Sequence, residues 1–191
     1  MYTYRNSGKK ISQADLSRAL NRLGDLLKTH NKRLEMVVAG GVISLLYFRS
    51  RTMTEDVDAI FPSNPANRAL LVSLIKQVGD ELGFATSPRS VWFNDSVSFF
   101  GLQTKSDVVV FNHPFLCLKA AKWEELLAHK VHAFRDEKDI ADAVLLFKQI
   151  TGKTSDQLFA DVVRYAPISP DVPTATLRRN FDEVAKRAQK T

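Results

Sequence analysis

Two short patterns in the first third of the chain hold the residues best suited to chemistry. The segment 37–61 reads V-V-A-G-G-V-I-S-L-L-Y-F-R-S-R-T-M-T-E-D-V-D-A-I-F, with Gly40-Gly41 after one apolar run and Asp56-Val57-Asp58 opening the next. Successive side chains of a strand point to opposite sides, so we expect Asp56 and Asp58 on the same side. Neighbouring carboxylates repel each other and favour a hard divalent cation, and Mg²⁺ is the usual ion where substrate phosphates also bind.

The glycine pair and the residues near it are candidates for binding phosphate. Gly40 and Gly41 allow a sharp turn and present backbone N–H groups at a helix start, where phosphates bind readily. Arg51 lies between the two patterns and either contacts phosphate or pairs with Glu55. Further along, Asp107 precedes an apolar run and either supplies a third metal-binding carboxylate or merely ends a turn.

A second candidate region reads W-E-E-L-L-A-H-K-V-H-A-F-R-D-E-K-D-I-A-D-A-V-L-L over residues 123–146. Lys130 lies at the boundary of an apolar helical stripe, so it is either a surface lysine or a cation that faces a cleft. Asp139 has three open roles: it caps a helix that begins near Ile140, it orients Lys130, or it acts as a general base.

The periodicity of apolar residues predicts the elements that position these side chains. Leucines at helical spacing after Ser12 indicate an N-terminal helix, and short β-prone runs broken by Asn, Ser, Gly and Pro indicate strands. We expect an α+β fold with a small mixed sheet, divided into a core with its N-terminal helix at 1–118 and a helical portion at 119–191. The predicted helices are 12–30, 42–48, 66–82, 123–134, 139–150, 155–165 and 174–188, and the predicted strands are 34–39, 56–61, 91–93, 97–102, 108–111 and 115–118.

The composition is that of an ordinary soluble protein. The chain has 191 residues, 45% of them hydrophobic and 25% charged. No apolar stretch reaches the length of a membrane span, and the N-terminus lacks the apolar core of a signal peptide, so we expect a cytoplasmic protein. The single Cys117 excludes an intrachain disulfide framework, and the four histidines lack the spacing of a metal motif.

The net charge of +6 bears on possible partners. The surplus suits a polyanion such as RNA or a nucleoside triphosphate, and it equally suits a solvated basic helix and tail. The basic residues gather near both ends, at Arg5, Lys9, Lys10, Arg178, Arg179, Lys186, Arg187 and Lys190.

Together the two patterns resemble a known family. The glycine pair followed by D-V-D resembles the first motif of the polymerase β-like nucleotidyltransferase superfamily, whose minimal members include AbiEii-type toxins of abortive-infection and type IV toxin–antitoxin systems. Residues 123–146 resemble the family's second signature, in which Lys130 takes the lysine position and Asp139 the aspartate position. The W-F-N-D run at 92–95 is similar to a W-L-N-D element of uncharacterised bacterial members.

This resemblance implies a Mg²⁺-dependent enzyme that moves an NMP from an NTP to an acceptor hydroxyl. Asp56 and Asp58 would hold the metal, with Asp107 as the candidate third carboxylate. Lys130 would neutralise the triphosphate, and Asp139 would serve as a further catalytic residue. The helical portion would complete the active-site cleft. The leading acceptor is RNA, in particular tRNA, and an antitoxin protein is an expected partner.

One position departs from the family pattern. Val42 follows the glycine pair where the family usually has a serine whose hydroxyl can bind phosphate. The alternative is therefore a non-catalytic protein of the same fold that binds nucleotide, RNA or a partner protein.

Overall fold

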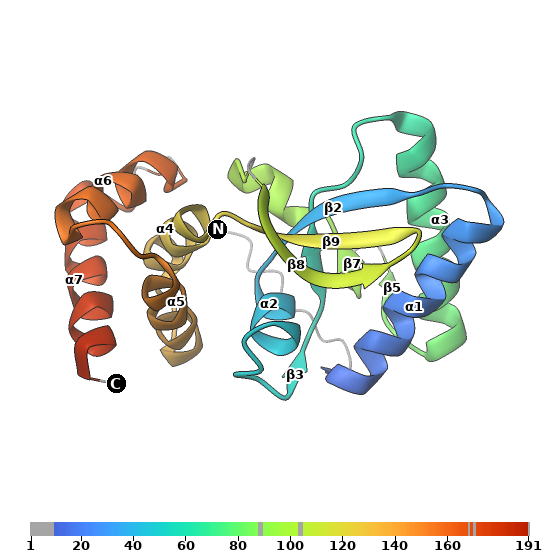
Figure 1. Ribbon diagram of the computed structural model, residues 1–191, viewed down its shortest axis with the longest axis horizontal. Coiled ribbons are helices and arrows are strands. Elements are labelled where there is room, and N and C mark those ends of the chain that lie inside the picture. Colours follow the sequence, from blue (N-terminus) through green and yellow to red (C-terminus); the bar gives the residue numbers. More distant parts are fainter. Residues whose placement is uncertain (1–9, 88–89, 103–104, 168, 170, 191) are drawn as a thin grey trace. The chain divides into compact units, whose positions relative to one another are not determined.

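The computed structural model describes residues 10–87, 90–102, 105–167, 169 and 171–190, and the basic residues Arg5 and Lys9 lie outside these ranges. The chain divides into two compact units, each described by itself (Figure 1). Unit 1 comprises Met1–Phe99 and Asp107–Ala120, and unit 2 comprises Phe100–Ser106 and Ala121–Thr191. The fold is α+β, as the sequence predicted.

Unit 1 is built on a mixed sheet whose strands, among the described residues, follow the order β7-β4-β2-β9-β8. Strand β2 pairs in parallel with β9 and antiparallel with β4, and β4 pairs in parallel with β7. Strand β4 therefore lies between β2, which precedes it in the chain, and β7, which follows it. The strand bounds are Leu34–Ala39 for β2, Val57–Ala59 for β4, Phe93–Asn94 for β7, Lys105–His113 for β8 and Leu116–Ala121 for β9.

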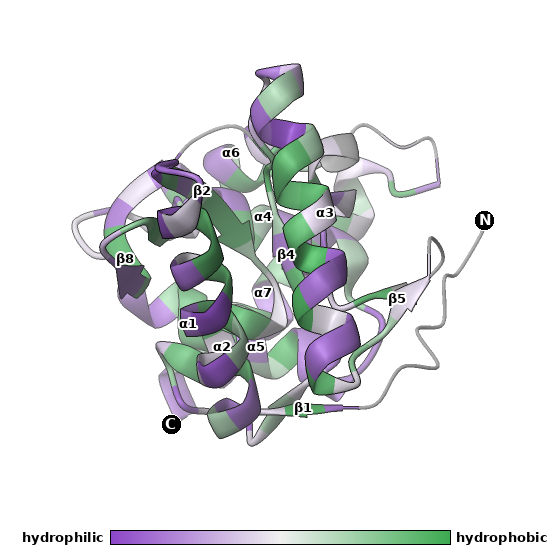
Figure 2. Ribbon diagram, turned by 90° about the vertical axis from the view of Figure 1, so that its right-hand side faces the viewer, coloured by the Kyte–Doolittle hydropathy of each residue, from purple (hydrophilic) through white to green (hydrophobic). Residues whose placement is uncertain are grey.

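Two long helices of unit 1, α1 (Gln13–Thr29) and α3 (Pro65–Leu82), lie side by side (Figures 1 and 2). The Ser12 side chain caps α1 by accepting a hydrogen bond from the Asp15 N–H. Helix α3 ends at Gly83, whose φ of 71° suits glycine. Both helices bury one apolar side, and the hydrophobic and hydrophilic residues alternate along them in Figure 2. The short helix α2 (Gly41–Leu46) follows β2.

Several short elements differ from the sequence prediction. The predicted strand 97–102 is wrong, because η1 (Ser96–Phe100) is a 3₁₀ helix. The Ser98 hydroxyl donates to the Asp95 carbonyl at 2.8 Å, and such local bonds compete with strand pairing. Residues 49–54, which lie outside the predicted helices and strands, contain β3 (Met53–Thr54), which pairs with β1 (Ile11–Ser12). The predicted strand 91–93 is divided between β6 (Ser90–Val91), which pairs with β5 (Thr86–Ser87), and β7.

The described residues of unit 2 form the helices α4 (Trp123–Ala133), α5 (Glu137–Gln149), α6 (Ser155–Tyr165) and α7 (Thr174–Lys190). The fully buried Phe181 of α7 lies near two other aromatic rings, with centroids 5.8 Å from Phe147 and 5.5 Å from Phe159. Among the described residues, no helix has the length and apolarity that crossing a membrane requires.

Candidate functional site

Of the two aspartates of the first motif, Asp58 lies in β4 and Asp56 directly precedes that strand. Val57 and Ala59 are fully buried, whereas Asp56 and Asp58 are half-buried. The register places Asp58 opposite Ala39 of β2 on one side and next to Asn94 of β7 on the other. The alternation of a strand therefore brings both carboxylates out of the core together.

Two polar side chains connect these carboxylates. The Asn94 amide donates to Asp56 Oδ2 at 3.2 Å, and the Ser96 hydroxyl lies 3.1 Å from Asp58 Oδ1. Asn94 Oδ1 in turn accepts from the Ser96 backbone N–H at 2.9 Å and lies within hydrogen-bonding reach of the Ser96 hydroxyl. The four side chains thus form a continuous chain in the order Asp56, Asn94, Ser96, Asp58. All of their acceptor atoms are oxygens, which suits a hard cation.

Glycine is required at positions 40 and 41 because a side chain at either position would come too close to neighbouring side chains. Gly40 has a φ of 71°, and a Cβ there would lie 2.8 Å from Asp58 Oδ2. A Cβ on Gly41 would collide with the Thr54 hydroxyl and would lie 3.7 Å from an Arg51 guanidinium nitrogen. Helix α2 has only six residues, so its start is not a phosphate site by itself. The main contribution of the glycines is the space that they leave beside Asp58 and Thr54.

The other first-motif candidates have different positions in unit 1. Arg51 lies near Gly41, because a Cβ on that glycine would come within 3.7 Å of a guanidinium nitrogen. Val42 is fully buried, so its side chain belongs to the core. Asp107 is exposed on β8, and β2 and β9 lie between that strand and β4. Three strand spacings amount to roughly 14 Å, so the structure does not bring Asp107 to the acidic pair.

In unit 2, the predicted lysine and aspartate form a charge cluster. Lys130 Nζ lies 2.7 Å from Asp139 Oδ1 and 2.9 Å from Asp142 Oδ2. The Lys130 side chain is 17% exposed, so it is not a surface lysine, and the two carboxylates are almost fully buried. Arg135 Nε adds a bond of 2.8 Å to Asp139 Oδ2. The contact that lets Asp139 orient Lys130 is therefore present.

The capping role considered for Asp139 is wrong. Helix α5 begins at Glu137, and its N-cap is Asp136, whose side chain accepts from the N–H groups of Lys138 and Asp139. Burial by itself would raise the Asp139 pKa, but the hydrogen bond from Arg135 and the positive charge of Lys130 outweigh it and lower the pKa to about 2. Asp139 is therefore ionised across the physiological range.

The two histidines of α4, His129 and His132, are partly buried. Burial, with a smaller effect of His132, lowers the His129 pKa to about 4, and burial also lowers the His132 pKa. Among the residues that the structure describes, no group of three or more His, Cys, Asp and Glu is arranged to hold a metal ion. A cation at β4 would therefore depend on two carboxylates together with neutral oxygens.

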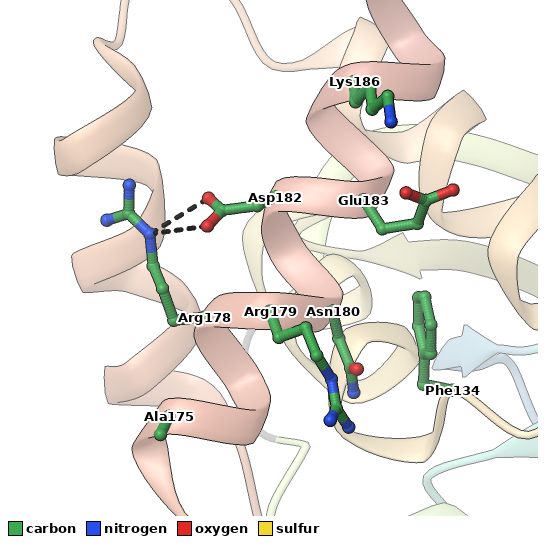
Figure 3. A pocket seen from close by; sticks show the side chains of 8 residues that line it. All are labelled: Phe134, Ala175, Arg178, Arg179, Asn180, Asp182, Glu183 and Lys186. Carbon is green, nitrogen blue, oxygen red and sulfur yellow. Dashed lines mark hydrogen bonds and ion pairs between the residues drawn. The ribbon is translucent and has the colours of Figure 1, made fainter.

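A hollow of about 650 Å³ lies along α7 in unit 2 (Figure 3). Arg178 on its lining points toward Asp182, with Nε 3.0 Å from a carboxylate oxygen, and Glu183 is a second lining acid. Arg187, elsewhere on α7, pairs with Glu137 and Glu183. These ion pairs reduce the basic charge that α7 offers to a polyanion. The lining residues are Phe134, Ala175, Arg178, Arg179, Asn180, Asp182, Glu183 and Lys186.

Sequence reasoning did not single out Asn94 or Ser96 as site residues. Asn94 belongs to the W-F-N-D run, so the run drew notice but its asparagine received no role. No sequence pattern marks Ser96 as a site residue, because only the pairing of β4 with β7 brings it close to Asp58. Comparison of the chain with protein-family models, curated proteins and solved structures finds no match.

Proposed function

We propose that this chain is a Mg²⁺-dependent nucleotidyltransferase with its metal-binding carboxylates at Asp56 and Asp58. The observation that carries the proposal is the emergence of both half-buried acids on one side of β4, beside the close turn at Gly40. Two adjacent carboxylates repel each other, and a divalent cation bound to both would relieve that repulsion. The resemblance of the two sequence motifs to nucleotidyltransferases supports the same function.

The residues present fit a magnesium ion. Asp56 and Asp58 supply anionic oxygens, and the amide and hydroxyl oxygens of Asn94 and Ser96 lie next to them. Mg²⁺ prefers such ligands together with substrate phosphates. When bound, the ion would stabilise the negative charge that develops on the phosphoryl oxygens.

The protein's own residues would then position the triphosphate for an in-line reaction. An acceptor hydroxyl oxygen forms a bond to the α-phosphorus while the bond to the β-phosphate oxygen breaks. Pyrophosphate leaves, and the hydroxyl proton is released. Arg51, next to Gly41, is the cation of unit 1 that we assign to the phosphates, because a guanidinium binds phosphate in a bidentate manner. Gly40 keeps the space beside Asp58 open.

The remaining assignments stay predictions. The pairing of Lys130 with Asp139 and Asp142 holds its ammonium group within unit 2, and its role at the triphosphate follows from the family resemblance. RNA, with tRNA leading, is the predicted acceptor. An antitoxin is the predicted protein partner, and the cytoplasm is the predicted location.

Transfer of label tests this function. The purified chain is incubated with Mg²⁺, total RNA and each α-³²P-labelled NTP in turn, and the RNA is separated on a gel. We expect label on RNA with at least one NTP and none after EDTA treatment. Asp58→Asn should lose about a hundredfold of the rate, because a metal site supplies several kcal/mol of transition-state stabilisation. Asp107→Asn is the matched control and should retain the parent's rate.

The same test distinguishes the catalytic function from the non-catalytic alternative. The fully buried Val42 offers no hydroxyl to phosphate, and this observation favours a protein that binds NTP without transferring it. Mg²⁺-dependent NTP binding in the absence of label on RNA, small hydroxyl compounds or protein would support that alternative. Equal labelling by Asp58→Asn and the parent would refute the metal assignment.

A further inference from the structure

The hollow of unit 2 has no role in the proposed function, and its lining combines an aromatic ring with basic side chains (Figure 3). We propose that it binds one nucleotide of a single-stranded RNA, with the base stacked on Phe134 and the flanking phosphates held by Arg179 and Lys186. RNA as the ligand rests on the proposed function, in which RNA is the predicted acceptor, whereas the site itself rests on the geometry of the hollow.

Two basic side chains of the lining have no acidic partner among the described residues. Arg179 and Lys186 are both exposed, and no hydrogen bond or ion pair joins either of them to another residue of the described ranges. Their neighbours on α7 differ, since Arg178 and Arg187 each form ion pairs. The positive charge that the hollow offers to phosphate oxygens therefore comes from Arg179 and Lys186.

These two cations lie on one face of α7. Residues 179, 183 and 186 are four and three positions apart, which places them in one row along a helix. Arg179 and Lys186 lie at opposite ends of this row, roughly 10 Å apart along the helix axis, with Glu183 between them (Figure 3). A site for a single phosphate would bring its cations together, whereas this spacing suits an extended strand with repeated phosphates.

The aromatic ring of the hollow belongs to a residue whose backbone conformation is rare for a bulky side chain. Phe134 ends α4 with a φ of 37° and a ψ of 45°, and its N–H donates to the Lys130 carbonyl at 2.9 Å. The Asn180 amide donates to the Val131 carbonyl at 3.0 Å, which ties α7 to the last turn of α4 beside the ring. Glycine would adopt this φ without strain, so the phenylalanine serves for its side chain. Its ring is half-buried, and stacking on such a ring accepts any base.

An acid within the row favours RNA over an acidic protein segment. The hydrogen bond from Arg187, together with the nearby charge of Lys186, lowers the pKa of Glu183, so this carboxylate is ionised at neutral pH. A carboxylate accepts several hydrogen bonds, so Glu183 can also accept one from the amino group of a base or from a 2′-hydroxyl. An acidic peptide would instead bring further carboxylates toward Glu183 and Asp182.

The experiment measures binding of unpaired RNA in the absence of metal and NTP. The full chain is titrated in EDTA into a fluorescein-labelled oligouridylate of about ten nucleotides, and fluorescence anisotropy gives the Kd. We expect affinity that falls with salt, because phosphate contacts release counterions. UMP should compete at least about tenfold less well than the unlabelled oligonucleotide at the same nucleotide concentration, because it offers only one phosphate.

Two competition results would overturn the inference. Equal competition by UMP would show a mononucleotide site rather than a site for an RNA strand. Displacement of the RNA by an oligoglutamate peptide as readily as by the unlabelled oligonucleotide would show a surface for acidic peptides.

Substitutions in the lining should weaken binding in two different ways. Phe134→Leu should weaken it about tenfold with an unchanged salt dependence, because it removes the stacking surface, and Phe134→Tyr should match the parent. Arg179→Gln and Lys186→Gln should each reduce the slope of log K against log salt by about 0.7. Lys148→Gln is the matched control, because it removes the same charge from an exposed position of α5 outside the lining, and it should retain the parent's slope.

The exposed cations decide the question if the Phe134 variants do not fold. A parent-like affinity and salt slope of both Arg179→Gln and Lys186→Gln would overturn the inference, as would an equal loss in Lys148→Gln. The inference and the proposed function fail separately. If the parent labels RNA from an NTP while the lining variants bind RNA like the parent, this inference alone fails. If the lining variants weaken binding as expected while no NTP labels any acceptor, the proposed function alone fails.

Discussion

Each unit of this chain contains a pair of acidic residues, and the two pairs differ in what compensates their charge. In unit 2, Asp139 and Asp142 are almost fully buried, and the ammonium group of Lys130 bonds to both. In unit 1, Asp56 and Asp58 are half-buried, and the amide of Asn94 and the hydroxyl of Ser96 approach them. The first pair is neutralised by a buried ammonium group, whereas the second is partly solvated and is contacted by neutral polar side chains.

This difference predicts different effects of substitution on stability in the two units. Buried ions require opposite charges because their desolvation is unfavourable, so removal of one partner is strongly destabilising. Partly solvated carboxylates held by neutral donors do not have that requirement, and removal of one of them relieves repulsion. Stability measurements therefore test the comparison directly, and the following expected effects run from the largest to the smallest.

The largest effect is expected at Lys130. Lys130→Met should lower the free energy of unfolding by about 3–5 kcal/mol, because Asp139 and Asp142 would lose the cation that joins them. Urea denaturation followed by circular dichroism measures the loss. Lys76→Met is the matched control, since Lys76 pairs with Asp80 at an exposed position of α3, and it should change stability by less than about 1 kcal/mol. Equal effects at the two lysines would contradict the buried ion-pair interpretation.

The pH dependence of unfolding should show the charge of Asp139. Its folded-state pKa of about 2 lies below the ordinary value of 3.8, so the unfolded state binds more protons between these values. The stabilisation is complete above about pH 4 and is lost as the pH falls through about 2, by an amount on the order of 2 kcal/mol.

Unfolding free energies from pH 5 to pH 2 measure this contribution. Asp139→Asn should lack it and show a correspondingly flatter curve than the parent. Asp107→Asn, at an exposed position, should retain the slope of the parent. If the unfolding free energy of Asp139→Asn depends on pH in the same way as that of the parent, the lowered pKa of Asp139 is refuted.

The glycine turn should respond in both stability and binding. Gly40→Ala should lower the free energy of unfolding by about 2–3 kcal/mol, because it combines an unfavourable φ with a Cβ placed 2.8 Å from Asp58 Oδ2. Gly83→Ala is the matched control, since Gly83 also has a φ of 71° but its Cβ would meet open space, and it should lose only about 1 kcal/mol. Binding of Mn²⁺ with a nucleotide analogue should fall only for Gly40→Ala.

The smallest effect on stability is expected within the acidic pair. Asp58→Asn should change the free energy of unfolding by no more than about 0.5 kcal/mol and in the stabilising direction, because it relieves repulsion with Asp56. Thermal denaturation at low and high salt provides the measurement. The increase should shrink with salt, since screening already weakens the repulsion in the parent. A large loss of stability would show that Asp58 serves the fold.

Much of the local structure could be predicted from the sequence. The α+β class, the amphipathic helices and the emergence of Asp56 and Asp58 on one side of a strand follow from periodicities that operate over a few residues. The predictions failed where short-range polar bonds compete with periodicity. The serines of η1 turned an expected strand into a 3₁₀ helix, and Asp136 rather than Asp139 became the cap of α5.

Tertiary structure alone decided what surrounds each acidic pair. Asn94 and Ser96 reach Asp56 and Asp58 from 38 residues away, through the parallel pairing of β4 with β7. No local pattern specifies such a pairing, because it depends on which strand edges the whole chain leaves available. Lys130 similarly meets Asp139 and Asp142 only because α4 and α5 fold back on each other. The sequence by itself determined which residues carry charge, and the packing of distant segments decided which side chains surround those charges.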